Sequence, residues 1–367
     1  MKQQSLITQV NSMKQQIKLL SSIYSNFPNS TLANFQILPK MFKTNIEVNK
    51  YLFEENKSLL IDINNNSDDQ LKGKFFIREE KKLSNNKALL RIATESEIID
   101  SKIIAIGGLG FDSLRHISAL LKATKNMANI NQYNETQRSK VVAIMPEVEP
   151  QARYAAAEIY SINPNYYPNY ILDRVKQFLL PKILQDDTVF AVPQTTAIFT
   201  FSMGGREAGM MENALKHVLE DELNLDQNLI ESLMKNIISI NIGYAPTIPS
   251  ITKKGFNKIA IFSTHDRAVL LPKDLYEQVL IKPEILDRKL SVIDFSEDKS
   301  DNQLLIVMNP DIQDNTSKED LCNHSLGDYL NCIEHSLPSE IKHAISLGFH
   351  NNFTDNTLLG EQYFENQ

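Results

Sequence analysis

The fold is organised around residues 196–210, which read TAIFTFSMGGREAGM. The run begins with apolar and β-branched residues, as a buried strand does, and it stops at a small hydroxyl residue, Ser202. Gly204 and Gly205 follow, and the apolar positions of residues 208–219 then recur at helical spacing. The stretch therefore predicts a strand, a very tight turn with Ser202 at its apex, and a helix.

The residue types fit the geometry of such a turn. A serine at the apex is held in a strained backbone conformation, with its oxygen exposed above the edge of the sheet. Nearby glycines are needed because a Cβ atom would collide where the strand and the helix come together. The unpaired N–H groups at the start of the helix favour the negative charge that develops on an attacked carbonyl. An ordinary strand-to-helix turn with a solvated serine is the alternative interpretation.

The turn resembles the nucleophile elbow of the α/β-hydrolase superfamily, which reads G-x-S-x-G and often has a second glycine. Residues 200–205 match this motif with one departure, because Thr200 stands where the family usually has its first glycine. A β-branched residue crowds the turn, so either the turn is slightly wider or the segment is not an elbow. The resemblance covers residues 58–335 and implies a mainly parallel sheet with helices on both faces.

The order of short apolar runs predicts the same α/β class. Closely spaced β-rich runs at 59–63, 75–78 and 88–92 predict an antiparallel meander, which the family also has before its parallel strands. Strand–helix alternation follows, which requires crossover connections and hence a parallel sheet. The strands predicted there span residues 102–106, 141–145, 196–201, 237–242, 258–262 and 304–308.

Two other segments complete the predicted organisation. Apolar residues near the N-terminus recur every three or four positions, so residues 1–55 are expected to form a helical extension. Residues 56–367 are expected to form one α/β-hydrolase-like domain. Within it, residues 146–169 are rich in Pro, Tyr and Asn and are expected to form an elaborated loop. Five tyrosines in or directly after this loop either line an acyl pocket or face solvent: Tyr154, Tyr160, Tyr166, Tyr167 and Tyr170.

A serine nucleophile needs a base, and a carboxylate to orient that base. In the family these partners follow the serine in the order acid, then histidine, on loops after later strands. The segment 258–269 is similar to the family's strand followed by G-x-x-D-x-x-V, which places Asp266 on the acid. Capping of a following helix is the alternative role for Asp266. His324 follows the last predicted strand, where the family has its catalytic histidine, and His350 is the alternative base.

The resemblance also implies two backbone donors for the developing oxyanion. One is the N–H of Met203, directly after the nucleophile, and the other is the N–H of Leu109. Residues 107–109 match the family's His-Gly-x loop, with Gly107 in place of the histidine. A glycine-rich loop can also bind phosphate, but this one lacks the Lys-Ser/Thr of a P-loop and the spacing of a dinucleotide fingerprint.

Composition excludes several other classes of function. The net charge of −7 and the absence of a basic run argue against nucleic-acid binding. No apolar run is long enough to span a membrane, and the N-terminus lacks the apolar core of a signal peptide. We therefore expect a cytoplasmic location, with export by a route that leaves no N-terminal mark as the alternative. Cys322 and Cys332 lie near His324 and His335, but their spacing matches no familiar zinc site, so no metal is expected.

Together these features predict a serine hydrolase that acts on an ester, thioester or amide through an acyl-enzyme. Its substrate would be a small or lipid-like acyl compound, and the chemistry requires no cofactor. The alternative is a hydrolase-like scaffold without catalysis that serves as a binding module. Thr200 and the choice between two histidines keep that alternative open.

Single substitutions distinguish the two candidate bases. We expect His324→Ala to lose about a hundredfold or more in the turnover of a short activated ester, because the serine then has no proton acceptor. His350→Ala is expected to keep wild-type turnover. The reverse result would move the base to the C-terminal tail, and wild-type turnover in both variants would favour the non-catalytic scaffold.

Overall fold

The residues that the computed structural model describes all lie within one compact unit of the chain, Asn45–Gln367. The described residues are 60–62, 68–80, 88–129, 141–185, 189–190, 196–266, 268–269, 271–286, 288, 290–296, 303–309, 324 and 326–330. The predicted helical extension over residues 1–55 lies outside them. So do several side chains discussed above, namely His335, His350, Cys322 and Cys332.

Strands and helices alternate along most of the described chain. The strands are β1 (Leu60–Asp62), β2 (Phe75–Glu80), β3 (Ala88–Ile92), β4 (Ile103–Ile106), β5 (Val141–Ile144), β6 (Leu184–Gln185), β7 (Val189–Phe190), β8 (Thr196–Phe201), β9 (Ile237–Ile242), β10 (Asn257–Ser263), β11 (Leu290–Asp294) and β12 (Gln303–Met308). The longer helices are α5 (Glu95–Asp100), α6 (Leu114–Asn129), α7 (Pro150–Ile162), α8 (Asn169–Phe178), α10 (Gly204–His217) and α11 (Gln227–Lys235). The short helices are α4 (Asp68–Leu71), α9 (Leu180–Ile183), η3 (Val218–Glu222), α12 (Ile248–Thr252), α13 (Lys273–Leu275), η4 (Tyr276–Leu280) and α14 (Pro283–Leu286).

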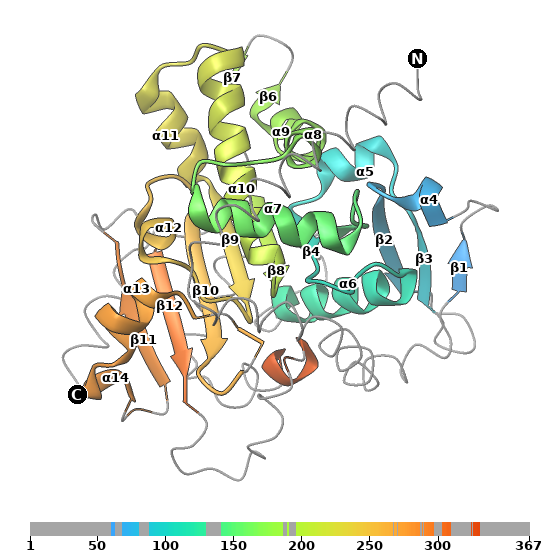
Figure 1. The fold of residues 1–367 in the computed structure, drawn as a ribbon. Coiled ribbons are helices and arrows are strands. Elements are labelled where there is room, and N and C mark those ends of the chain that lie inside the picture. Colours follow the sequence, from blue (N-terminus) through green and yellow to red (C-terminus); the bar gives the residue numbers. More distant parts are fainter. Residues whose placement is uncertain are drawn as a thin grey trace. The chain divides into compact units, whose positions relative to one another are not determined.

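One large mixed sheet forms the centre of the fold, in the order β1-β3-β2-β5-β4-β8-β9-β10-β12-β11 (Figure 1). From β5 through β4, β8, β9 and β10 to β12, every neighbouring pair is parallel. The residues of these strands are buried throughout, as expected for strands with helices packed on both faces. The predicted α/β class with a mainly parallel sheet is therefore confirmed.

Antiparallel pairs of strands occur toward the two ends of the sheet, together with one parallel pair. β2 runs antiparallel to both β3 and β5, and β11 runs antiparallel to β12. The predicted three-strand meander is wrong in one pairing, because β1 lies parallel to β3 and does not touch β2. Since β3 and β5 occupy both edges of β2, only the outer edge of β3 is available to β1.

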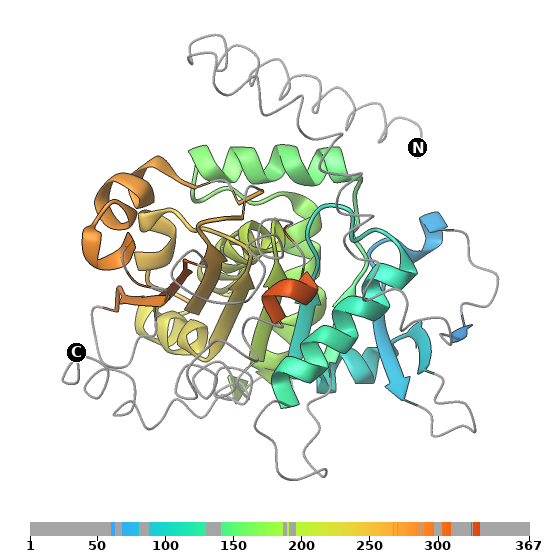
Figure 2. The ribbon, with the colours of Figure 1, turned by 90° about the horizontal axis from the view of Figure 1, so that it is seen from below.

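Helices pack on both faces of the sheet (Figures 1 and 2). Alternate strand residues, such as Phe199 in β8 and Ile240 in β9, share a core cluster with Leu120 of α6. The residues between them, such as Ile198, belong to a second cluster with side chains of α8 and α10, including Met211. Ser202 directly follows β8, so it lies at the carboxyl end of a central strand, between the helices that cover the two faces of the sheet.

Residues 146–169 are not the long loop that their composition predicts. Most of them form α7, which begins at Pro150 in a position where proline is favoured because its missing N–H has no helical partner. The buried side chains of α7 fall at helical spacing: Arg153, Ala156, Ala157 and Tyr160. Of the five tyrosines proposed to line a pocket or face solvent, Tyr160, Tyr166, Tyr167 and Tyr170 instead pack in or against the second cluster.

The buried aromatic residues of the parallel strands should dominate stability. We expect Phe262→Ala in β10, where the side chain is fully buried, to lower the free energy of unfolding by about 3–5 kcal/mol in urea titrations. Tyr276→Ala is the control, because that side chain is 51% exposed and its removal should change stability by about 0.5 kcal/mol or less. Equal losses in both variants would contradict this assignment of the core.

Candidate active site

Ser202 occupies the tight turn between β8 and α10. Its φ angle is 57°, in the left-handed region that residues with a side chain rarely adopt. The Ser202 N–H donates to the carbonyl of Ile242 at 2.8 Å, and the Ser202 carbonyl accepts from Gly205 N–H at 3.0 Å. These bonds hold the strained residue from both sides, so the predicted turn with Ser202 at its apex is present.

Two close approaches explain the glycines around the turn. A Cβ atom on Gly204 would lie 2.7 Å from the carbonyl oxygen of Ile106, at the end of β4. A Cβ atom on Gly108 would lie 2.7 Å from Ser202 Cβ and 3.1 Å from its Oγ. A real Cβ atom essentially never comes within 3.0 Å of such an atom, so the loop after β4 can lie against Ser202 only because glycine stands at both places.

Thr200 fits into the turn despite replacing the family's usual glycine. Its side chain is fully buried, and its hydroxyl donates to Asn241 Oδ1 at 2.7 Å, across the parallel pair β8–β9. A Cβ atom on Gly204 would lie 3.2 Å from Thr200 Cβ, so the glycine on the helix side leaves the room that the threonine occupies. The hydroxyl has a partner and the methyl group has space, which removes the physical objection to an elbow here.

His324 connects the serine to a carboxylate. Its Nε2 lies 2.6 Å from Ser202 Oγ, and its Nδ1 lies 2.6 Å from Asp266 Oδ2. A carboxylate next to Nδ1 favours the tautomer with the proton on that nitrogen, which leaves Nε2 free to accept the serine proton. The structure thus brings together all three residues of the predicted triad, although 122 positions separate Ser202 from His324 along the chain.

Asp266 is buried and accepts bonds on both oxygens. Oδ2 accepts from His324 and from the hydroxyl of Tyr329 at 2.8 Å, whereas Oδ1 accepts from Ala268 N–H at 2.9 Å. The Tyr329 oxygen in turn accepts from the N–H of Ser263, the last residue of β10, at 3.0 Å. Asp266 therefore contacts the histidine and also fixes the turn that follows β10. The alternative role, capping of a following helix, is wrong, because the N-cap of the next described helix, α13, is Pro272.

An aromatic ring packs against the imidazole. The ring of Phe201 stacks on that of His324 with centroids 4.9 Å apart and planes 28° apart. Phe111 and Tyr329 meet the same phenylalanine edge-on, at 5.7 and 6.4 Å. A ring face against the imidazole restricts its rotation and favours its positive charge once it is protonated.

The two predicted oxyanion donors come from two different segments next to the serine. Met203 directly follows Ser202, and Leu109 directly follows Gly108, which lies against the serine side chain. Among the residues that the structure describes, neither the Met203 N–H nor the Leu109 N–H has an acceptor. Both are therefore available to a bound group, as the resemblance implies.

Behind this loop lies Arg153 of α7, a residue that the sequence reasoning missed. Its guanidinium donates to the carbonyls of Gly107 at 2.8 Å and Gly108 at 3.0 Å, and to Glu207 Oε1 at 2.6 Å. Glu207 lies in the first turn of α10, the helix that begins just after Ser202. The periodicity of Arg153 with the alanines of α7 was the only sequence signal for its burial.

A second arginine completes the buried charge network. Arg174 of α8 donates to Glu207 Oε2 at 2.8 Å and makes a bidentate pair with Glu147, at 2.9 and 2.5 Å. Burial alone would raise the pKa of Glu207, but its pKa is lowered because Arg153 and Arg174 stabilise the carboxylate. Two guanidinium groups and two carboxylates balance, so the network places no net charge in the interior.

A second serine–histidine contact lies nearby but has a different geometry. Ser113 Oγ is 2.9 Å from His116 Nδ1, and Asp112 Oδ1 is 3.8 Å from that same nitrogen. Because the hydroxyl and the carboxylate approach one nitrogen, the imidazole cannot pass a proton from one side to the other. Ser113 therefore provides an internal comparison for Ser202.

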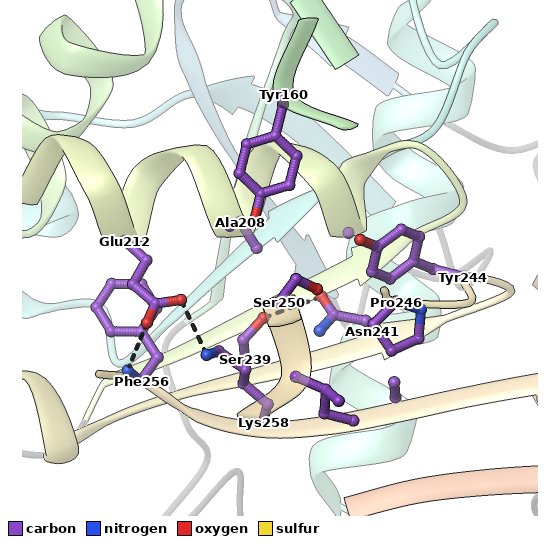
Figure 3. A pocket seen from close by; sticks show the side chains of 14 residues that line it. Tyr160, Ala208, Glu212, Ser239, Asn241, Tyr244, Pro246, Ser250, Phe256 and Lys258 are labelled. Atoms are coloured by element: carbon purple, nitrogen blue, oxygen red, sulfur yellow. Dashed lines mark hydrogen bonds and ion pairs between the residues drawn. The ribbon is translucent and has the colours of Figure 1, made fainter. Parts of the chain in front are cut away.

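A small cavity lies between α10 and the strands β9 and β10 (Figure 3). Its volume is ≈ 20 Å³, enough for about one water molecule. Its walls include Tyr160, Tyr244 and the buried ion pair of Glu212 with Lys258, at 3.2 Å. Neither Ser202 nor His324 lines it. The cavity is therefore too small for an acyl group and is separate from the serine.

No protein-family model matches the chain, and no curated protein matches it significantly. Within the described ranges, no helix has the length and apolar character needed to cross a membrane. The same residues contain no group of three or more His, Cys, Asp or Glu side chains that could hold a metal ion.

The buried carboxylate of Glu207 should make the fold sensitive to acid. Its pKa lies below the ordinary value of 4.5, so its ion pairs stabilise the protein above that pH and are lost as the pH falls through the lowered pKa. We expect Glu207→Gln to be less stable at pH 7 and to lose less further stability below about pH 4.5 than the wild type does. Urea titrations from pH 7 to pH 3 measure this, and parallel pH profiles for the two proteins would contradict it.

Proposed function

We propose that this chain is a serine hydrolase of the α/β-hydrolase type. The hydrogen-bond chain from Ser202 Oγ through His324 to Asp266, with both contacts at 2.6 Å, is the observation that carries the proposal. The strained backbone of Ser202 and the mainly parallel sheet, with β2 antiparallel to both of its neighbours, support it. The substrate class is an ester, thioester or amide of a small or lipid-like acyl group.

The proposed first half-reaction acylates the serine. Ser202 Oγ attacks the carbonyl carbon while its proton passes to His324 Nε2, and Asp266 stabilises the imidazolium that forms. The carbonyl oxygen becomes an oxyanion beside the N–H groups of Met203 and Leu109. The tetrahedral intermediate then collapses, the bond to the leaving group breaks, and His324 returns the proton to the departing oxygen, sulfur or nitrogen.

In the second half-reaction water replaces the leaving group. His324 Nε2 accepts a proton from water as the water oxygen attacks the acyl carbon. Collapse of this intermediate breaks the bond to Ser202 Oγ, which regains its proton and releases the carboxylic acid. The sequence of steps is balanced in protons and requires neither a metal nor an organic cofactor.

Labelling by a fluorophosphonate tests whether Ser202 is activated. We expect the wild type to be labelled at Ser202 and Ser202→Ala to be inert, with hydrolysis of a short activated ester lost in parallel. The thermal midpoint should stay nearly unchanged, because the serine side chain contributes little packing.

Ser113→Ala is the matched control, since it removes the hydroxyl of the other serine–histidine contact. It should keep full labelling and turnover. An inert wild type would favour the non-catalytic scaffold, and a loss of several degrees in Ser202→Ala would mark the serine as structural.

A further inference from the structure

Arg153 holds the glycine loop by its carbonyl groups. Its side chain is 2% exposed, and two of its nitrogens bond to successive carbonyls, those of Gly107 and Gly108. The Gly108 carbonyl also accepts from Phe111 N–H at 3.3 Å, which closes the loop into a turn. Both peptide groups of the loop are therefore fixed in orientation by one planar guanidinium group.

The direction of these carbonyls determines the direction of the oxyanion donors. In a planar trans peptide the C=O and N–H groups point in opposite directions. The Gly108 carbonyl shares its peptide with the Leu109 N–H, and the Gly107 carbonyl shares its peptide with the Gly108 N–H. Because Arg153 draws both carbonyls toward α7, both N–H groups are directed away from it.

The position of Gly108 supplies the other half of the geometry. A Cβ atom there would lie 3.1 Å from Ser202 Oγ, so the loop is in direct contact with the serine side chain. A cation bonded to the carbonyl also polarises the peptide, which strengthens the N–H as a donor to an anion. Arg153 thus acts on orientation and on polarity without touching the reacting atoms.

Glu207 connects Arg153 to the helix that follows Ser202. One carboxylate oxygen binds Arg153, and the other binds Arg174, which is anchored in turn by Glu147. Since Glu207 lies in the first turn of α10, the guanidinium that orients the loop is held by the same helix that follows Ser202. A shift of the loop relative to the serine would break a buried charge-assisted bond.

We propose that Arg153 is a positioning residue that aims the N–H groups of the 107–109 loop at the oxyanion, a role that rests on the proposed hydrolase function. Arg174 has no such role. It is equally buried and binds the same carboxylate, but its bonds go to Glu207 and Glu147 and not to the loop. The two arginines therefore form a matched pair for experiment.

The test compares Arg153→Lys and Arg153→Met with Arg174→Lys and Arg174→Met. For each variant we would measure the thermal midpoint, kcat and KM for a short activated ester, and the inhibition constant of a trifluoromethyl ketone that forms a tetrahedral adduct with serine. All four substitutions weaken the buried network, so all four should lower the midpoint.

Only the Arg153 variants should lose transition-state binding. We expect Arg153→Met to lower kcat by about a hundredfold with KM changed less than about threefold. The inhibition constant of the trifluoromethyl ketone should rise in parallel with the loss of kcat. Arg153→Lys should recover part of the loss, because an ammonium can donate to one carbonyl but not to both in a fixed fork. The Arg174 variants should stay within about threefold of wild-type kcat.

Three outcomes would overturn the inference. Equal kcat losses in the Arg153 and Arg174 variants would assign both residues to stability alone, and a loss confined to KM would assign Arg153 to substrate binding. A wild type that neither reacts with fluorophosphonate nor hydrolyses esters would remove the proposed function and this role with it. If Arg153→Met does not fold, Arg153→Lys is compared with Arg174→Lys alone, because lysine keeps the buried positive charge.

Discussion

At the carboxyl end of β8 the backbone passes through a conformation that residues with a side chain disfavour, at a cost of about 1–3 kcal/mol. The surroundings hold Ser202 in that conformation. The carbonyl of Ile242 binds its N–H, and the missing side chains of Gly204 and Gly108 let β4 and its loop close in around it. In this conformation the Ser202 hydroxyl lies 2.6 Å from His324 Nε2.

Charge buried behind the turn keeps it from relaxing. Glu207, Arg153 and Arg174 have almost no access to water, and separating one member from the others would leave an unpaired ion in the interior. Replacing such a network by apolar side chains often costs little stability. The bonds of Arg153 to the carbonyls of Gly107 and Gly108 therefore suggest that the network orients the loop, which apolar side chains could not do.

Local pattern was enough to predict the parallel strands and the residues at their carboxyl ends, because burial on both faces and tight turns leave strong signals in sequence. Ser202, Asp266 and His324 could be named because the resemblance supplied their order. Arg153 and Tyr329 could not, since their partners are backbone groups and side chains far away in the chain. The pairing of β1 and the edge strand β11 were missed for a related reason, because edge positions depend on which neighbours are already occupied.

The separation of the three linked side chains along the chain also bears on how the protein folds. His324 meets Asp266 across 58 positions and Ser202 across 122, and such distant contacts form only after long segments of chain have been closed. During synthesis the strand and turn that present Ser202 emerge well before His324 does. A nascent or partly folded chain therefore carries Ser202 without its contact to His324, and on the proposed function its hydroxyl would stay unreactive until the parallel sheet has assembled.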